Sequence, residues 1–381
     1  MRFLHTSDWH LGMTYRSGVS YIEDQKKFID EIADIAIREK VDGILIAGDI
    51  FDKSIASQDA LKIYDEAMTI LCGRLDVPVF IIAGNHDGAE RLASCNKLLE
   101  KSGLYIAGSL KKNPRCINMG DVDIYLLPWI STDKVKAVYP ELENQINSLE
   151  DAYRIVLDDY RAGFVKGHKH IVVSHAYIAN AETSTSDKTA EIGKATVVDA
   201  SVFEGFDYVA LGHLHGPQQI NRHIRYSGTP MAYSFGKEEK QEKSVTIYDS
   251  NTDSVEVIPL HPYRCRTSLE GTYEELMELE LADEVRQGYI KLDVKDCVVG
   301  LDVIATFRGL FPNLLEIDGK SLENADAKIT MTLDELESED TDPEVVFGRY
   351  CVDMIGEEPS EHILDIFRRA YSRFENGEED E

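Results

Sequence analysis

Residues 43–52 read Gly-Ile-Leu-Ile-Ala-Gly-Asp-Ile-Phe-Asp, and this stretch decides the fold. It begins with a short, mostly aliphatic run, Gly43–Ala47, and continues with the pair Gly48-Asp49. Continuous apolar runs of this length, bounded by chain-breaking residues, are typical of buried strands. We therefore expect Asp49 at the carboxyl end of an interior strand.

Four other stretches repeat this pattern of an apolar run that ends in a polar cluster. They are Arg2–His5 before Ser7-Asp8-Trp9-His10, Val77–Ala83 before Gly84-Asn85-His86-Asp87, Ile171–Val173 before Ser174-His175, and Tyr208–Leu211 before Gly212-His213-Leu214-His215. Helical patterns lie between several of the runs, at residues 23–40, 60–75 and 89–102. Strands that alternate with helices predict a layered α/β domain, whose ligands bind beyond the carboxyl ends of the strands. The five polar clusters are thus expected to converge.

The chain beyond residue 215 changes character. Residues 243–249 and 254–260 alternate around a turn and predict a hairpin. A smaller α/β unit follows, with strands expected at 264–269, 289–294 and 314–318 and helices at 272–281 and 301–310. Residues 333–343 have the composition of a linker, and helices are expected at 344–354 and 360–374. We expect three parts: a main domain at 1–262, an α/β cap at 263–333 and a tail at 334–381.

The composition is that of a globular chain that is poorly suited to bind nucleic acid alone. Of 381 residues, 43% are hydrophobic and 29% are charged, which excludes a disordered or fibrous protein. The net charge is −29, and residues 331–381 hold 17 acidic and four basic residues. Because phosphate affinity usually comes from Lys and Arg, a phosphate-binding site must be local, built from metal ions or a small basic patch, or shared with a partner.

The cysteines and the apolar runs indicate the compartment. None of the six cysteines lies in a CxxC pair, which indicates reduced thiols in a cytoplasmic protein. No apolar run approaches the ~20 residues that span a bilayer, and residues 1–10 show no secretory leader. We expect a cytoplasmic protein that has no membrane contact.

The polar clusters contain seven side chains suited to divalent metal ions. They are Asp8, His10, Asp49, Asn85, His175, His213 and His215. Imidazole, carboxylate and amide ligands suit Mn²⁺, Fe²⁺ or Zn²⁺. Because no thiolate is among them, a structural zinc site of the cysteine type is not expected. We expect two ions, ~3.5–4 Å apart and bridged by Asp49, which can clamp a phosphate and generate hydroxide for in-line attack.

His86 follows Asn85 but is expected to project differently, so that it protonates the leaving oxygen or stabilises the charged transition state. We expect Asp87 to orient that imidazole. Each residue alone has an ordinary structural explanation, such as a turn for Asp49 or a buried core histidine for His175. The joint pattern of five strand ends that all carry ligand-type side chains favours one shared dimetal site.

The five clusters resemble the five motifs of the calcineurin-like metallophosphoesterases. Within that superfamily, His5–Gly12 and Asp207–His215 resemble the SbcD family of nuclease subunits. The resemblance is strong over residues 1–260 and holds only in outline beyond them. It implies an α/β fold of four layers, a β-sandwich flanked by helices, with a small α/β cap and a C-terminal helical tail.

The resemblance also implies an activity and assigns the ligands. The implied protein is a Mn²⁺-dependent DNA nuclease, both a double-strand exonuclease and a single-strand or hairpin endonuclease, which processes DNA ends in repair and recombination. Its cofactors would be two Mn²⁺ ions, with Mg²⁺ or another divalent ion as the alternative. By matching motifs, one ion is assigned to Asp8, His10, Asp49 and His215, and the other to Asp49, Asn85, His175 and His213. His86 takes the place of the catalytic histidine and Asp87 that of its partner.

The implied partners are DNA and SbcC, an ATPase with a long coiled coil, in a heterotetramer with two copies of each chain, cytoplasmic and associated with the nucleoid. Related nucleases form homodimers through helices that correspond to residues 60–75 and 89–102. The apolar stripe there consists of Leu61, Tyr64, Met68, Leu71, Leu92, Cys95 and Leu99, for which core packing is the alternative. The tail stripe consists of Ile363, Phe367, Ala370, Tyr371 and Phe374, which would bind SbcC or pack on the chain's own cap.

Basic residues in or near the metal loops are candidates for DNA phosphate contacts, although each is also explained as a surface charge. They are Arg16, Lys53, Arg91, Lys188 and Lys194. Three other functions stay open at this point. They are a phosphoesterase for phosphoproteins or cyclic nucleotides, a small-molecule phosphatase, and a non-catalytic DNA-end tether whose metal site is structural.

Overall fold

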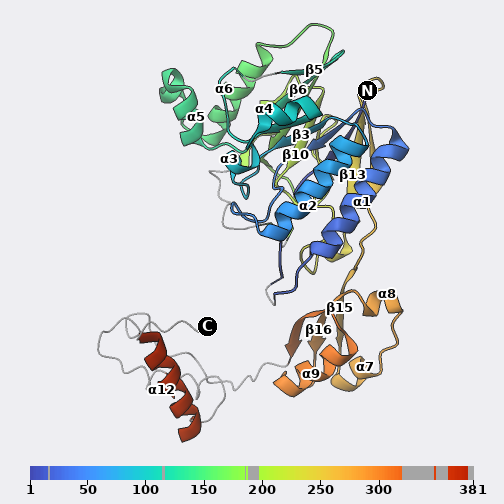
Figure 1. Cartoon of the computed structure of the whole chain (residues 1–381), viewed down its shortest axis with the longest axis vertical. Coiled ribbons are helices and arrows are strands. Elements are labelled where there is room, and N and C mark those ends of the chain that lie inside the picture. The colour runs from blue at the N-terminus through green and yellow to red at the C-terminus, as the bar shows by residue number, and fades with distance from the viewer. Residues whose placement is uncertain are drawn as a thin grey trace. The chain divides into compact units, whose positions relative to one another are not determined.

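The computed structural model describes residues 1–15, 18–113, 116–184, 186–187, 197–319, 347–348 and 359–375. The chain forms two compact units, Met1–Gly319 and Lys320–Glu381, and each is described by itself. Figure 1 shows the first unit as a body of sheets and helices, with a smaller sheet that contains β15 and β16.

Two six-stranded sheets form the body. The first contains, in spatial order, β14 (Ser254–Pro259), β13 (Ser244–Asp249), β1 (Arg2–Thr6), β2 (Gly43–Ile46), β3 (Val79–Ile82) and β4 (Leu104–Ala107). The second contains β11 (Gln218–Gln219), β12 (Ile224–Tyr226), β10 (Tyr208–Gly212), β7 (Lys169–His175), β6 (Val122–Leu127) and β5 (Ile117–Met119). Strands β1 to β4 are mutually parallel, as are β6, β7, β10 and β12, so their carboxyl ends share one edge of each sheet.

Side chains alternate between two cores along these strands, because successive residues point to opposite faces of a sheet. Leu45 and Phe80 pack between the two sheets, whereas Ile44 and Ile81 pack outward. On the second sheet Val173 packs between the sheets and Val172 packs outward. The outward residues need helices over them, so the body has the four layers that the family resemblance implied.

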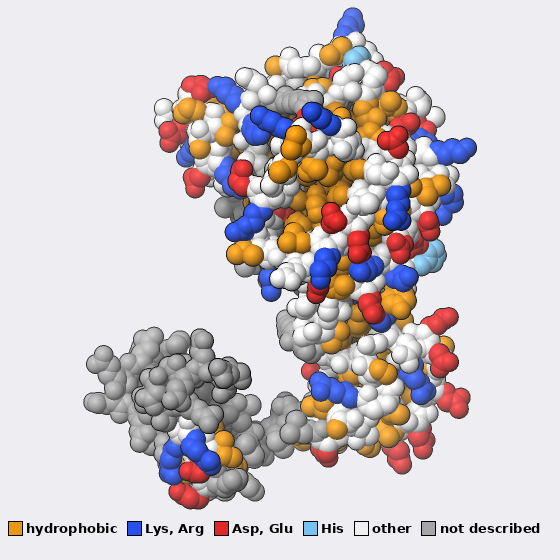
Figure 2. Space-filling view, in the orientation of Figure 1, with side chains coloured by type: hydrophobic (Ala, Val, Ile, Leu, Met, Phe, Trp, Pro, Cys, Tyr) orange, Lys and Arg blue, Asp and Glu red, His pale blue; other side chains and the backbone are white. Residues whose placement is uncertain are grey.

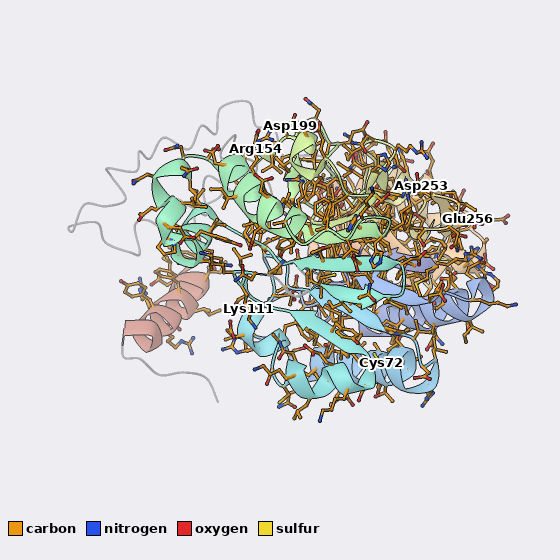
Figure 3. All side chains as sticks on the ribbon, turned by 90° about the horizontal axis from the view of Figure 1, so that it is seen from above. Cys72, Lys111, Arg154, Asp199, Asp253 and Glu256 are labelled. Atoms are coloured by element: carbon orange, nitrogen blue, oxygen red, sulfur yellow. The ribbon has the colours of Figure 1, made fainter. Side chains whose placement is uncertain are left out.

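Helices cover both outer faces. Figure 1 shows α1 (Ile22–Glu39) and α2 (Gln58–Met68) side by side near β13. The second sheet is covered by α5 (Thr132–Val138) and α6 (Leu149–Arg161). In Figure 3 the labelled Cys72, which follows α2, and Arg154, within α6, lie on opposite outer sides of the sheets.

Three of the expected helices differ from the prediction, and the one expected at 272–281 is shorter, since it spans only Tyr273–Met277. Helix α2 begins earlier, because Ser57 caps it by accepting a hydrogen bond from the Ala60 N–H, and a π-helical turn, Thr69–Arg74, continues it. Residues 89–102 form no continuous helix but α3 (Ala89–Leu92), α4 (Asn96–Leu99) and a short 3₁₀ turn. The break lies at Cys95, whose φ of 59° is left-handed and turns the chain toward β4. Tertiary position here overrides the helical pattern.

The third sheet contains β15 (Arg266–Gly271), β16 (Tyr289–Val294) and β17 (Leu314–Gly319), all parallel. Helices α7 (Tyr273–Met277), α8 (Asp283–Arg286) and α9 (Leu301–Leu310) belong to this part, and it has its own hydrophobic cluster. A two-stranded sheet of β8 (Tyr177–Ile178) and β9 (Val197–Val198) completes the first unit. The boundaries at 262 and 333 stay a prediction.

Arg266 joins the third sheet to the body. Its guanidinium lies 5.1 Å from the ring centroids of Tyr21, Phe235 and Tyr289, and it donates hydrogen bonds to the Ala232 carbonyl and the Tyr21 hydroxyl. A buried cation surrounded by aromatic faces gains cation–π attraction in place of water. This contact ties the first strand of the cap to α1 and to the loop after β12.

In the second unit, α12 (Glu361–Glu375) agrees with the helix expected at 360–374. The helix expected at 344–354 lies largely outside the described residues. Within the part of the chain that the structure describes, no helix is both long enough and apolar enough to cross a bilayer. The five described cysteines are all free thiols.

We expect Arg266→Ala to destabilise the first unit by about 3 kcal/mol, because it strands buried hydrogen-bond acceptors and empties the aromatic cage. Urea unfolding followed by tryptophan fluorescence measures this change. The exposed Lys295, paired with Asp293 and Glu270, provides the control, and Lys295→Ala should cost less than about 0.5 kcal/mol. Equal costs for the two variants would contradict the assignment of Arg266 as the joint.

Candidate metal centre

The predicted ligands lie where the carboxyl ends of five strands meet. His175 is the last residue of β7 and pairs in register with Gly212, the last residue of β10. The loops after β1 and β2 are joined by backbone hydrogen bonds, since the N–H groups of Asp8 and His10 donate to Gly48 and Asp49 at 3.0 Å. The backbone N–H of His213 donates to the Asp8 carboxylate at 3.0 Å, so the loops of the two sheets contact each other.

One group of side chains surrounds His175. Its Nε2 lies 2.9 Å from Oδ1 of Asn85 and 3.3 Å from Oδ2 of Asp49. His213 joins them through Nδ1, 3.1 Å from the same Asn85 oxygen. Asp8 lies near this group, since one ligand atom each from Asp8, Asp49 and His175 fall within 4.8 Å of one another.

A second group surrounds His10. Its Nε2 lies 3.2 Å from Nε2 of His215, and one ligand atom each from Asp8, His10 and His215 fall within 4.8 Å of one another. Another set of the same size is formed by His10, Asp49 and His86. Asp49 thus lies between the two groups, in the position that a bridging carboxylate requires.

The chemistry of these contacts fits a cation. His175 Nδ1 donates to the carbonyl of Ala47 at 2.8 Å, so a neutral ring turns its Nε2 lone pair toward the oxygens of Asp49 and Asn85. Lone pairs that face one another in a buried place repel unless a positive charge lies between them. Nδ1 of His10 is also buried without a hydrogen-bond partner. The donor set therefore suits divalent metal ions.

The backbone at this place is strained. Asp8, His10, Asp49 and His213 have φ values of 53°, 44°, 49° and 104°, in or beyond the left-handed region that side chains other than glycine rarely adopt. Each such residue costs about 1–3 kcal/mol and persists where the surrounding structure enforces it, typically at functional sites. Four of the seven predicted ligands share this property.

Glycines before the ligands allow the close approach of these loops. A Cβ on Gly84 would lie 2.1 Å from Oδ1 of Asp49, and one on Gly212 would lie 1.9 Å from the carbonyl oxygen of Ala47. A Cβ on Gly48, whose φ is 87°, would meet the His175 ring at 2.6 Å. Only glycine fits at these three positions.

Burial and neighbouring charges set the protonation of the site. Burial lowers the pKa of His213 to about 3 and that of His10 well below its usual value, so both rings are neutral, as metal ligands must be. Burial raises the pKa of Asp8 to about 8. Burial would also lower the pKa of His175, but the adjacent Asp49 carboxylate raises it to about 9, so a proton occupies this place when no cation does.

His86 lies at the mouth of the site. Its ring Nδ1 donates to the backbone carbonyl of Asp52 at 2.8 Å, and its backbone N–H donates to the Asp49 carboxylate. The centroid of its ring lies 4.8 Å from that of the His10 ring. The prediction that Asp87 orients this imidazole was wrong. Both Asp87 oxygens accept backbone N–H groups instead, from Ile50, Phe51 and Gly84, so that Asp87 fixes the loops after β2 and β3.

The candidate DNA contacts have mixed outcomes. Lys53 is exposed, one residue after the carbonyl that holds His86. Arg91 is exposed and donates to the carbonyl of Ser54 at 2.8 Å, so it supports the same loop. Arg16, Lys188 and Lys194 lie outside the described residues.

Several side chains at the site were not predicted. The Trp129 ring stacks on His213 with centroids 5.3 Å apart, and the Tyr233 ring lies 5.8 Å from His10. Ser186 and Glu238 adjoin His215. Trp129 follows a strand that carries none of the five motifs, and Glu238 stands in a charged run, Lys237–Lys243, that is typical of solvated surface.

Comparison with known proteins agrees with this geometry. Residues 1–217 match the family described as Calcineurin-like phosphoesterase. Two relatives are named as the SbcD component of the nuclease SbcCD. That of Staphylococcus saprophyticus is 29% identical over 94% of both chains, and that of Staphylococcus epidermidis is 30% identical over 86% of this chain and 87% of its own. The solved structure of the Thermus thermophilus protein TT1561 has 12% identity and a TM-score of 0.39 and covers 68% of this chain and 99% of its own.

The family match defines the class of the protein, and the two Staphylococcus relatives define its closer relationship. The chain belongs to the calcineurin-like phosphoesterase family and, within it, to the SbcD family of nuclease subunits. The family resemblance that the five motifs suggested is therefore confirmed.

We expect Gly84→Ala to abolish tight metal binding, since the added methyl group must displace the Asp49 carboxylate. Overpacking of this kind also lowers the free energy of unfolding by about 1–3 kcal/mol. Calorimetric titration with Mn²⁺ and thermal unfolding measure the two effects. A Cβ on Gly73 would meet no atom within 4 Å, so Gly73→Ala is the control: it should leave Mn²⁺ binding unchanged and should not lower the free energy of unfolding, since alanine is favoured over glycine in a helical turn. Undiminished Mn²⁺ binding by the Gly84 variant would contradict the assigned role of Asp49.

Proposed function

We propose that the protein is the nuclease subunit of an SbcC–SbcD-type complex, which hydrolyses DNA phosphodiesters with two divalent metal ions, Mn²⁺ in the first place. The observation that carries this proposal is the meeting of Asp8, His10, Asp49, His175 and His215 in overlapping groups of possible ligands. The names of the two relatives support the choice of a nucleic-acid substrate. Double-strand exonuclease and single-strand or hairpin endonuclease activities belong to the proposal.

The chain's own residues would share the work as follows. Asp8, His10, Asp49 and His215 hold one ion, and Asp49, Asn85, His175 and His213 hold the other. When bound, the ions polarise the phosphate and lower the pKa of water.

His86 contributes a hydrogen-bond donor rather than a ligand. Since its Nδ1 hydrogen is committed to the Asp52 carbonyl, its Nε2 is the nitrogen that can meet an oxygen of the substrate. The attack of water on phosphorus breaks one P–O bond, and the leaving oxygen then needs a proton. With a hydrogen on Nε2 as well, that is as an imidazolium, His86 is placed to supply that proton or to stabilise the charge on the phosphate.

The acidic chain argues for a shared DNA-binding surface. With a net charge of −29, the isolated subunit is expected to bind DNA weakly, and a partner must supply much of the positive charge. The proposed partner is the SbcC ATPase, in a complex with two copies of each chain at the nucleoid in the cytoplasm.

The homodimer in that complex is proposed to form through α2 and α4. Figure 2 shows hydrophobic side chains gathered on the face that carries these helices. Leu61 is 51% exposed and Leu98 is 64% exposed, although Met68, Leu71 and Leu92 of the predicted stripe are buried in the chain's own core. Exposed leucines beside buried ones are consistent with an apolar contact to a second copy.

The nuclease proposal is tested with Mn²⁺ on linear DNA, on a phosphate monoester and on a cyclic nucleotide. We expect cleavage of DNA above all, and a loss of about 10²–10⁴-fold in His86→Ala, because that variant lacks the proton donor. Mn²⁺ binding and DNA binding should persist in the variant. The exposed His261, which pairs with Glu31, is the control, and His261→Ala should cleave normally.

Each outcome of this assay separates the alternatives. A wild-type protein that degrades no DNA, even with the ATPase partner and ATP, would refute the nuclease proposal. Rapid cleavage of the monoester or the cyclic nucleotide alone would favour another phosphoesterase, and DNA binding without any cleavage would favour a tether.

The tail is proposed to bind the ATPase partner through α12. Ile363 and Ile366 are 43% and 52% exposed on this helix. We expect Ile366→Glu in the full chain to weaken co-purification with the ATPase by at least tenfold, because a charge enters an apolar contact. Asp365→Ala is the control, because it changes an exposed charged side chain on the same helix and should leave co-purification unchanged. Full association of the Ile366 variant would exclude this face.

A further inference from the structure

His215 is held from outside the metal centre by a buried polar network. Oγ of Ser186 lies 2.5 Å from its Nδ1, and the Asp187 carboxylate accepts its backbone N–H at 2.9 Å. Lys243 donates to its carbonyl oxygen at 3.0 Å. Three separate partners therefore fix the ring, the backbone N–H and the backbone carbonyl of His215.

Glu238 anchors this network. Its side chain has no exposed surface, and it accepts hydrogen bonds from the Ser186 hydroxyl at 2.7 Å, from the Ser234 N–H at 2.8 Å and from Lys243 Nζ at 3.1 Å. Lys243 is itself buried and donates to Thr229 Oγ1 at 2.9 Å. A carboxylate that faces an ammonium and several N–H and O–H donors is ionised and only accepts.

The direction of each hydrogen bond follows from this charge. Because Glu238 only accepts, the hydroxyl hydrogen of Ser186 points at Glu238, and the Ser186 oxygen must accept from its other neighbour. That neighbour is Nδ1 of His215, which therefore carries the ring hydrogen. The more distant Ser184 hydroxyl, 3.3 Å from Ser186, can adapt to either arrangement. The Nε2 of His215 is then left with its lone pair on the side of His10 and Asp8.

We propose that Ser186 and Glu238 are positioning residues that keep the hydrogen of His215 on Nδ1, so that its Nε2 is always ready to bind a metal ion. Histidine ligands usually donate their second ring hydrogen directly to a carboxylate or carbonyl, as His175 does to Ala47. Here a serine hydroxyl is inserted between the ring and the carboxylate. The inference rests on the proposed metal site and adds two residues, from two distant segments, to it.

The test uses a matched pair of variants at Ser186. Ser186→Thr keeps the hydroxyl, and the valine of Ser186→Val has the shape of threonine without the hydroxyl. Any steric effect of the larger side chain is therefore common to both variants. Titration calorimetry of the full chain with Mn²⁺ should show one of two sites weakened by about 10-fold or more in the valine variant, while the threonine variant stays within about twofold of wild type. Thermal unfolding of the metal-free proteins measures separately the structural cost of losing the buried hydroxyl, which the valine variant is expected to show.

The outcomes are distinguishable from those of the nuclease assay, because no substrate is present. If wild type binds no Mn²⁺, the proposed function fails as well. If wild type binds Mn²⁺ and the valine variant binds it as tightly as the threonine variant, only the relay is refuted. A valine variant that lowers the melting temperature but not the Mn²⁺ affinity would also overturn it, since Ser186 would then be structural alone.

The part of Glu238 is tested by a double-variant cycle. Glu238→Gln should weaken Mn²⁺ binding by about 10-fold in the wild-type background and by less than about threefold in the Ser186→Val background. The serine route is already lost there, and what still joins Glu238 to His215 is Lys243 and the 3.7 Å approach of Glu238 to Nδ1. Asp123→Asn, which removes a buried carboxylate at the amino end of β6, controls for destabilisation and should leave Mn²⁺ affinity unchanged. Equal losses in the two backgrounds would refute a relay through Ser186. The Ser186 pair decides the question by itself where the Glu238 variant does not fold.

Discussion

The structure is organised around one constraint: electron-rich side-chain atoms that repel one another must be held close together at one edge of a β-sandwich. Asp49, Asn85 and His175 turn electron-rich atoms toward each other within 2.9–3.3 Å, and the arrangement is stable with a cation between them or, in its absence, with a proton on His175. Glycines that admit no Cβ and residues forced to positive φ keep the loops in this costly position. The two sheets and their helices supply the packing energy that offsets the strain.

Much of this arrangement could be predicted because it depends on strands and their ends. The apolar runs before Asp8, Asp49, Asn85, His175 and His213 are strands β1, β2, β3, β7 and β10 in the structure. Parallel strands with a common direction bring their carboxyl ends together, so the convergence of those side chains follows from topology. Their service as metal ligands stays a prediction, since convergence alone does not show what they bind.

What could not be predicted depends on contacts between segments far apart in the chain. Asp87 follows His86 and was expected to orient its imidazole. Instead, the Asp87 carboxylate accepts hydrogen bonds from the backbone N–H groups of Ile50, Phe51 and Gly84. The pattern of 89–102 is helical, yet a turn at Cys95 interrupts it where the chain must reach β4. Glu238 and Lys243 have the appearance of surface charges in the sequence, and only the fold buries them together. Local periodicity carries no information about such pairings.

The order of the strands has a consequence for folding during synthesis on the ribosome. Strand β1, which leads to Asp8 and His10, pairs on one side with β2 but on the other with β13, at Ser244–Asp249. A nascent chain therefore carries its first strand as an open edge until more than two hundred further residues have been synthesised. The last two imidazoles of the cluster, His213 and His215, are also synthesised shortly before that closing strand, so translation must be well advanced before the cation-binding edge can assemble.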